Sequence, residues 1–160
     1  MPMTPVAELP LTVWTDFVRL FLGKFLGSGV SREVYELAIN RELVVKIERA
    51  RGFQNVLEWR TWNDLKHTDY AQYLAPCEAI SPCGTVLLMR RARPLPPEKE
   101  NTPLPSFLSD FKHRNYGMLE GRVVCVDYGD TKAISMGAEG SVLESPEWWK
   151  TEWWHEDGSE

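Results

Sequence analysis

The chain lacks several features that would assign it to a class of protein at once. Its 160 residues contain no apolar run of about 18 or more, which a membrane-spanning helix needs. It also lacks a basic segment followed by an apolar core and a small-residue cleavage site, the pattern of an export signal. We therefore expect no membrane association and a location in the cytoplasm, either of a bacterium or of a host cell.

Cysteine is scarce, and basic charge is not concentrated. Cys77, Cys83 and Cys125 are odd in number and show no CxxC or Cys/His spacing, so neither a disulfide framework nor a zinc site is expected. Residues 1–138 hold 17 Lys and Arg against 16 Asp and Glu, so the net charge of −5 comes from the tail, residues 139–160. Because nucleic-acid binding depends on clustered basic side chains that neutralise phosphates, no nucleic-acid partner is expected.

Apolar residues in the first half of the chain follow the pattern of a sheet. Short β-branched and aromatic runs over residues 21–47 are interrupted at residues 27–29 and 40–41, which predicts three antiparallel strands. Residues 77–80 and 85–89 predict two more strands.

Two segments have helical spacing. Residues 1–20 predict a short amphipathic helix that packs on the domain. Residues 53–66 contain neither Gly nor Pro, and they place Glu58, Trp62 and Leu65 on one face of a helix. A single acid on this otherwise apolar face indicates a partner for its charge.

The second half of the chain is richer in proline and in loop residues. Five prolines within residues 93–109 exclude a regular helix and predict an extended connector. A polar loop over residues 110–117 follows, and then a hairpin over residues 118–126 that turns at Glu120-Gly121.

Three segments carry residue types suited to phosphate chemistry. Gly27 and Gly29 lie in a strand-turn-strand segment, where missing side chains let backbone amides approach phosphate oxygens; a plain turn is the alternative. Lys46 is flanked by apolar residues in a strand, and an outward-facing edge lysine is the alternative there. A buried lysine and a buried Glu58 are each costly alone and tolerable as a pair, so we expect the two to meet.

The most specific segment is Asp110 to Asn115, which has the form DxKxxN. Twelve residues after its Asn comes Asp127-Tyr128-Gly129, and a hairpin-sized stretch separates the two motifs. The alternative is a polar surface loop followed by a strand-ending turn.

In this order, the segments between residues 21 and 130 resemble the protein-kinase family: its glycine-rich loop, its strand lysine, its catalytic loop and its DFG element. The resemblance implies an α+β fold with a five-stranded antiparallel N-lobe sheet, one αC-like helix and a strongly reduced C-lobe. It also implies ATP and Mg²⁺ as cofactors. The chain would be a single domain, with an N-lobe over residues 21–92 and catalytic and metal-binding loops over residues 110–138.

The resemblance also implies roles for individual residues. Asp110 would orient or deprotonate the acceptor hydroxyl, and Lys112 would contact the transferring phosphoryl group. Asn115 and Asp127 would hold Mg²⁺. The remaining residues would bind the nucleotide. Gly27, Gly29, Lys46 and Glu58 would lie at the phosphates. Val34 and the hinge that follows the fifth strand, with Met89, Arg90 and Ala92, would lie at the adenine.

The chain departs from the family pattern at several points. The third glycine of the loop is Arg32, and the His-Arg that normally precedes the catalytic Asp is Leu108-Ser109. The proline-rich connector takes the place of a long supporting helix, so the catalytic loop must rest on something else. Ser145-Pro146-Glu147 resembles the APE element, but thirteen residues follow it, too few for the family's substrate-binding helices.

Three functions are therefore expected as alternatives. The first is a minimal Ser/Thr protein kinase that modifies a host or partner protein, or itself. The second is a pseudokinase that binds and regulates a partner without catalysis, and the third is a small-molecule kinase. The small size and the resemblance bring an origin in a bacteriophage or another mobile element to mind, which the sequence does not prove. The paired tryptophans of residues 147–160 would either pack back on the domain or bind a partner or a second copy of the chain.

Overall fold

The computed structural model describes residues 16, 18–49, 52–131, 138 and 140–146. Most of the expected N-terminal helix and the paired tryptophans of the tail lie outside these residues. The chain divides into two compact units, which are described separately: residues 1–60 with 76–91, and residues 61–75 with 92–160.

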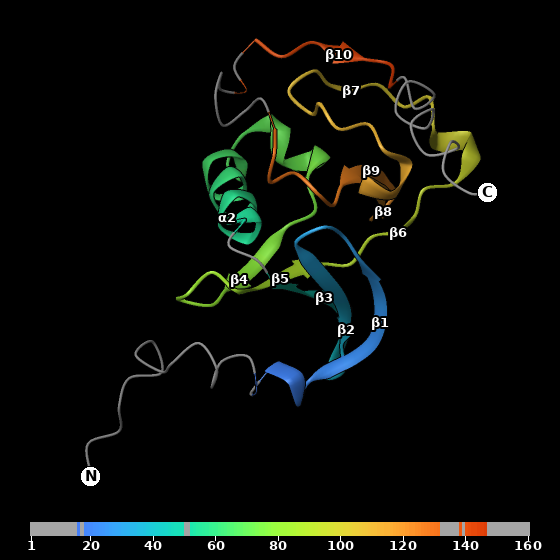
Figure 1. The fold of residues 1–160 in the computed structure, drawn as a ribbon. Coiled ribbons are helices and arrows are strands. Elements are labelled where there is room, and N and C mark those ends of the chain that lie inside the picture. The colour runs from blue at the N-terminus through green and yellow to red at the C-terminus, as the bar shows by residue number, and fades with distance from the viewer. Residues whose placement is uncertain (1–15, 17, 50–51, 132–137, 139, 147–160) are drawn as a thin grey trace, which may run out of the picture. The chain divides into compact units, whose positions relative to one another are not determined.

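The first unit is built on a five-stranded antiparallel sheet (Figure 1), which confirms the sheet predicted from the sequence. Its spatial order is β1-β2-β3-β5-β4. The strands are β1 (Leu22–Ser28), β2 (Arg32–Leu37), β3 (Asn40–Glu48), β4 (Cys77–Ile80) and β5 (Val86–Arg90).

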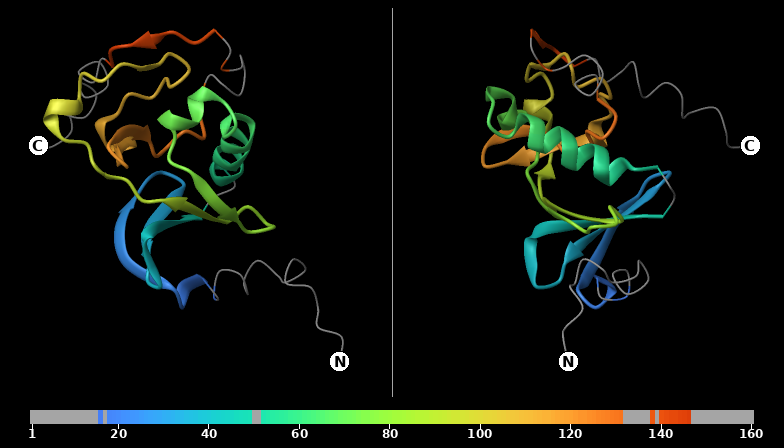
Figure 2. Two further views of the ribbon diagram at one scale, coloured as in Figure 1. Left: turned by 180° about the vertical axis from the view of Figure 1, so that it is seen from behind. Right: turned by 90° about the vertical axis from the view of Figure 1, so that its left-hand side faces the viewer.

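Alternation along the strands separates the two faces of this sheet. One face carries an apolar cluster of Leu37, Val45, Ile47 and Val86, against which Val18 and other apolar side chains pack. Lys46 lies between Val45 and Ile47 in sequence, so its side chain points to the opposite face. The views in Figure 2 show how strongly the strands of this sheet curve.

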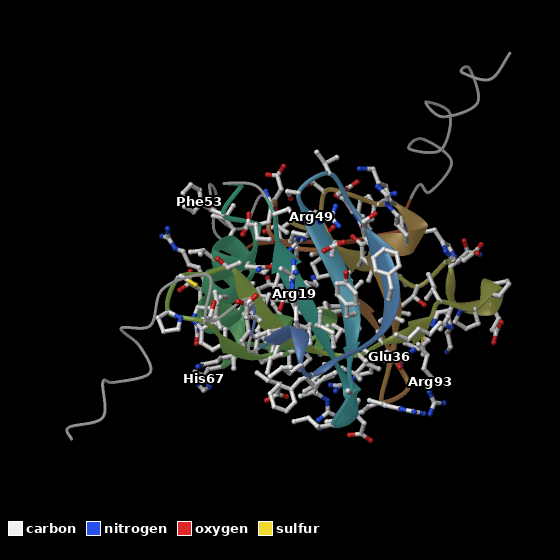
Figure 3. The ribbon with its side chains drawn as sticks, turned by 60° about the horizontal axis from the view of Figure 1, so that its bottom comes forward. Arg19, Glu36, Arg49, Phe53, His67 and Arg93 are labelled. Atoms are coloured by element: carbon white, nitrogen blue, oxygen red, sulfur yellow. The ribbon has the colours of Figure 1, made fainter. Side chains whose placement is uncertain are left out.

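Helix α2 (Gln54–Leu65) follows the first three strands. It begins after Phe53 (Figure 3), an exposed residue whose φ is 54°. The Glu48 carboxylate at the end of β3 accepts hydrogen bonds from the backbone N–H groups of Gln54 (2.9 Å) and Asn55 (3.4 Å). A carboxylate in this place satisfies donors that the first turn leaves without helical partners.

The buried positions of α2 recur at helical spacing and confirm most of the predicted face. Glu58 and Leu65 are buried as expected, and Trp62 is half-buried. Asn55 and Thr61 are also buried, at 0% and 3% exposure, although neither was predicted to be.

The second unit contains two small sheets. The predicted hairpin is confirmed as β8 (Tyr116–Leu119) and β9 (Arg122–Cys125), to which β6 (Arg93–Pro94) adds a third strand. Glu120 and Gly121 have φ values of 51° and 79°, as a type I′ turn requires.

The proline-rich connector contains no regular α-helix, as predicted, but it is not fully extended. It forms the single 3₁₀ turn η3 (Pro97–Lys99) and the strand β7 (Leu104–Pro105), which pairs with β10 (Leu143–Glu144). Two further 3₁₀ segments are η2 (Asp69–Tyr73) and η4 (His113–Asn115).

Tyr128 holds the end of the hairpin to the segment before β4. Its ring is fully buried, and its hydroxyl donates to the backbone oxygen of Ala75 at 2.7 Å. The N–H of Ala75 in turn donates to the oxygen of Cys125 at 2.9 Å. None of the described helices is long and apolar enough to cross a membrane.

Candidate functional site

The first unit joins Lys46 and Glu58 as the sequence predicts. Lys46 Nζ donates to Glu58 Oε1 at 3.0 Å and to Oε2 at 2.8 Å. The lysine side chain is 5% exposed and the carboxylate is fully buried. A pair with both oxygens bonded places the ammonium group in one fixed position on the α2 face of the sheet.

Two buried residues that the sequence reasoning did not assign to the site complete this cluster. Arg32 Nη1 lies 3.0 Å from Glu58 Oε1 and 3.5 Å from Asn55 Oδ1. Asn55 Nδ2 donates to the backbone oxygens of Lys46 (3.2 Å) and Thr85 (2.8 Å), so the amide ties α2 to β3 and to the residue just before β5. Helical spacing could have indicated Asn55, which lies three residues before Glu58 on the same face.

The glycine-rich turn joins β1 to β2 beside this cluster. The N–H of Gly29 donates to the oxygen of Arg32 at 2.8 Å and closes the turn. A Cβ placed on Gly27 or Gly29 would meet no atom within 4 Å, and neither residue has a positive φ. Neither packing within the chain nor backbone strain therefore explains these two glycines, whereas the approach of a ligand to the backbone would.

Val34 shares a sheet face with the charged cluster, because it pairs with Lys46 across β2 and β3. It is half-buried. The geometry is that of an apolar side chain next to the lysine, the position that the resemblance assigns to adenine contact.

In the predicted hinge, residues 89–92, backbone donors that the resemblance assigns to adenine are already hydrogen bonded within the chain. Met89 is fully buried at the end of β5. The N–H of Arg90 donates to the backbone oxygen of Pro76, and the N–H of Arg91 donates to the backbone oxygen of Glu42, both at 2.8 Å. These two donors are therefore used within the first unit, and Ala92 belongs to the second unit.

The second unit brings together three residues of the DxKxxN motif. Asp110 Oδ2 accepts from Lys112 Nζ at 3.1 Å and from Asn115 Nδ2 at 2.9 Å. Asp110 and Lys112 are partly exposed, with side-chain exposures of 41% and 40%, whereas Asn115 is buried. Because the Asn115 amide nitrogen is the donor, its Oδ1 is the atom suited to a metal ion.

Other contacts support this loop where the family pattern is missing. Leu108 is 1% exposed and anchors the segment before Asp110 in the core. His113 Nε2 lies 3.1 Å from Glu100 Oε1 and links the loop to the proline-rich connector. The ring of Phe111 stacks on Tyr116 with centroids 6.0 Å apart, and burial raises the pKa of Tyr116, which keeps its phenol neutral.

Asp127 lies two residues beyond β9, the second strand of the hairpin that follows this loop. The N–H of Val126 donates to the backbone oxygen of Asn115 at 2.8 Å, so the residue before Asp127 is bonded to the loop. Asp127 itself is exposed, and its backbone oxygen accepts from Cys125 Sγ at 3.3 Å. A carboxylate and an amide oxygen are the hard ligands that Mg²⁺ prefers. No cluster of three or more His, Cys, Asp and Glu occurs within the described ranges.

Ser145 and Pro146 of the APE-like segment follow β10 directly, and Glu147 lies outside the described residues. The five-stranded sheet, helix α2 and the buried Lys46–Glu58 pair are consistent with the N-lobe of a protein-kinase-like fold.

Comparison with known proteins agrees with this class. The chain resembles the aminoglycoside phosphotransferase APH(2")-IIa, which was solved as a ternary complex with streptomycin and ATP and has a protein-kinase-like fold. The TM-score is 0.53 and the sequence identity 10%, over 90% of this chain and 74% of that chain. No protein-family model and no curated protein matches the sequence. The similarity is therefore one of fold, and the reduced C-lobe stays a prediction.

Proposed function

We propose that this chain is an ATP- and Mg²⁺-dependent phosphotransferase that acts on a hydroxyl group. The observation that carries the proposal is the Lys46 ammonium group, held by both oxygens of a fully buried Glu58. A buried ion pair is a costly way to stabilise a fold, since well-packed apolar residues do as well or better. It is justified where a fixed cation has to meet a phosphate.

In this proposal the first unit binds the nucleotide. Lys46 contacts the α- and β-phosphates, and the backbone around Gly27 and Gly29 contacts phosphate oxygens. The half-buried Val34 provides apolar surface to the adenine, whereas the fully buried Met89 has no exposed surface to offer it. Since the N–H groups of Arg90 and Arg91 are already hydrogen bonded, Arg90 and Ala92 take part through the Arg90 oxygen and the Ala92 N–H.

The second unit carries the residues for transfer. Asp110 orients the acceptor hydroxyl and takes up its proton, and Lys112 contacts the transferring phosphoryl group. Asn115 Oδ1 and the Asp127 carboxylate hold the metal. When bound, Mg²⁺ neutralises charge on the phosphates of the nucleotide.

Two kinds of hydroxyl group are candidate acceptors of the phosphoryl group. The kinase motifs favour a Ser or Thr hydroxyl on a host or partner protein, or on the chain itself. The neighbour's complex with streptomycin supports a hydroxyl of a small polar molecule instead, an acceptor that does not need a peptide-binding platform. Both acceptors fit the same transfer chemistry.

A transfer assay with γ-labelled ATP and Mg²⁺ tests the proposal. The acceptor arms are the chain alone, a host-cell lysate, and streptomycin as a representative aminoglycoside. We expect label in at least one arm, and its loss in Asp110→Ala and Asp127→Ala. Label that persists in both variants would indicate a contaminating kinase. Stabilisation by ATP without transfer in any arm would favour the pseudokinase, a module that binds and regulates a partner.

A further inference from the structure

Arg32 occupies the last position of the glycine-rich turn, where the family pattern has its third glycine. It is the first residue of β2, and its side chain points to the same sheet face as Val34 and Lys46. The family pattern has a glycine at this position, which has no side chain, whereas this chain has a long basic one. The residue itself is 8% exposed, so the side chain is directed into the fold.

Arg32 shares a carboxylate with Lys46. Glu58 Oε1 lies 3.0 Å from Arg32 Nη1 and also 3.0 Å from Lys46 Nζ. Lys46 already bonds both oxygens of this carboxylate, so the Lys46–Glu58 pair does not need a second cation. Two cations bonded to one oxygen atom repel each other, and this repulsion is strongest where water is largely excluded.

The guanidinium group is also held in place. Asn55 Oδ1 lies 3.5 Å from Arg32 Nη1, and Asn55 is itself fixed by its bonds to Lys46 and Thr85. The Arg32 side chain is 9% exposed and that of Lys46 is 5% exposed, so the two cations are covered to a similar degree. A side chain ordered before binding loses little conformational entropy on binding.

We propose that Arg32 is a second phosphate-binding residue, which recognises the polyphosphate of the nucleotide together with Lys46. This inference rests on the proposed function and goes beyond it, because it assigns the phosphate site to two side chains from adjacent strands. A guanidinium group presents a planar fork of donors that matches phosphate oxygens, and it stays charged at all relevant pH values. The guanidinium group adds side-chain donors at a position where a glycine has no side chain.

Binding measurements on Arg32→Met, with Arg49→Met as the matched control, test the proposal. Arg49 (Figure 3) directly follows the last residue of β3, is 62% exposed at its side chain and pairs with Glu33. Each variant removes one arginine, so the two variants have the same net charge as each other. The probes are ATP, adenosine and inorganic tripolyphosphate, with affinity measured by calorimetry and folding checked by circular dichroism.

We expect Arg32→Met to weaken ATP and tripolyphosphate binding roughly ten- to hundredfold, the range for hydrogen bonds to a charged group. Adenosine affinity should stay within about twofold, and Arg49→Met should match the native chain. A parallel loss of ATP and adenosine binding, or unchanged ATP affinity, would show that Arg32 only braces Glu58. Should Arg32→Met fail to fold, Arg32→Lys keeps the charge and loses the fork, and it should still weaken tripolyphosphate binding more than adenosine binding.

The two proposals fail in different ways. If the native chain binds neither ATP nor adenosine, the proposed function is wrong. The tripolyphosphate arm then decides about Arg32 by itself, because it does not depend on the base. If the native chain binds ATP and the Arg32 variants keep the native preference for ATP over adenosine, the inference about Arg32 is wrong and the proposed function stands.

Discussion

Glu58 neutralises two cations, and it is the one fully buried carboxylate in the part of the chain that the structure describes. Removing it leaves Lys46 and Arg32 without their shared anion. We expect Glu58→Ala to lower the free energy of unfolding by about 3–5 kcal/mol, as for other broken buried pairs. Lys46→Met should cost clearly less, because Arg32 still neutralises Glu58. Urea denaturation of both variants measures the difference, and equal losses would contradict the shared-carboxylate geometry.

Asp110 contacts two residues of its own loop but has a modest structural role, since its carboxylate is 41% exposed. We expect Asp110→Asn to lower the rate of phosphoryl transfer by about 10²–10⁴, the usual contribution of a general base. ATP affinity should stay close to that of the native chain. Single-turnover assays with the preceding exposed residue changed, Ser109→Ala, give the control. A rate for Asp110→Asn within a few-fold of the control would remove Asp110 from the transfer step.

Cys83 differs from the buried Cys77 and Cys125 because it is exposed in the turn between β4 and β5. Burial opposes ionisation of its thiol, but hydrogen bonds with Ser81 and Thr85 outweigh this effect and lower the pKa. The thiolate is the reactive form, so alkylation by iodoacetamide should reach half its maximal rate at a lower pH than for an ordinary thiol. Mass spectrometry locates the label, and Cys83→Ser should abolish it in the native state. A midpoint at or above the ordinary thiol value would contradict the hydrogen-bonded geometry.

Among the elements, the β8–β9 hairpin depends on two consecutive residues with positive φ, Glu120 and Gly121. A glutamate tolerates this conformation poorly, whereas Asn-Gly is the preferred pair for a type I′ turn. We expect Glu120→Asn to raise the free energy of unfolding by about 0.5 kcal/mol and Gly121→Ala to lower it by about 1 kcal/mol. Thermal unfolding of the two variants measures both changes. A gain in stability from Gly121→Ala would rule out the positive φ.

The order and type of these main elements could be predicted because each depends on local sequence. Short β-branched and aromatic runs between turn residues identified the strands, and helical spacing in a segment without Gly or Pro identified α2. The strands β7 and β10 were missed, because each has two residues and their pairing joins Leu104 to Glu144 far along the chain. A pairing of that range leaves no periodic signal in either segment.

The candidate site was predictable where a motif fixes spacing within one loop, as for Asp110, Lys112 and Asn115, which the structure brings together. Arg32 was noted in the sequence only as a missing glycine. Its contact with Glu58 depends on the sheet face to which β2 turns it, and that face is decided by register with β3. Asn55 was missed for a related reason, since its partners lie on β3 and before β5.

At the scale of the whole molecule, binding of a nucleotide should stabilise the native chain against heat. At about a hundredfold excess over its Kd, a ligand that binds only the folded state adds about 2.7 kcal/mol, or roughly 5–11 °C in Tm for a chain of this size. We expect ATP with Mg²⁺ to give a larger shift than ATP with EDTA, because Asn115 and Asp127 supply oxygen ligands to the metal.

Asp127→Asn should reduce the magnesium-dependent part of this shift and leave the shift with ATP and EDTA unchanged, since Lys46 and the glycine-rich turn are intact. Asp130→Asn is the matched control, because Asp130 is an exposed acid three residues further along the same segment. The control also corrects for the change in net charge, which by itself alters attraction between the chain and a polyphosphate. If both variants respond alike, the metal does not bind at Asp127, and the magnesium ligands must be sought among other oxygen atoms of the chain.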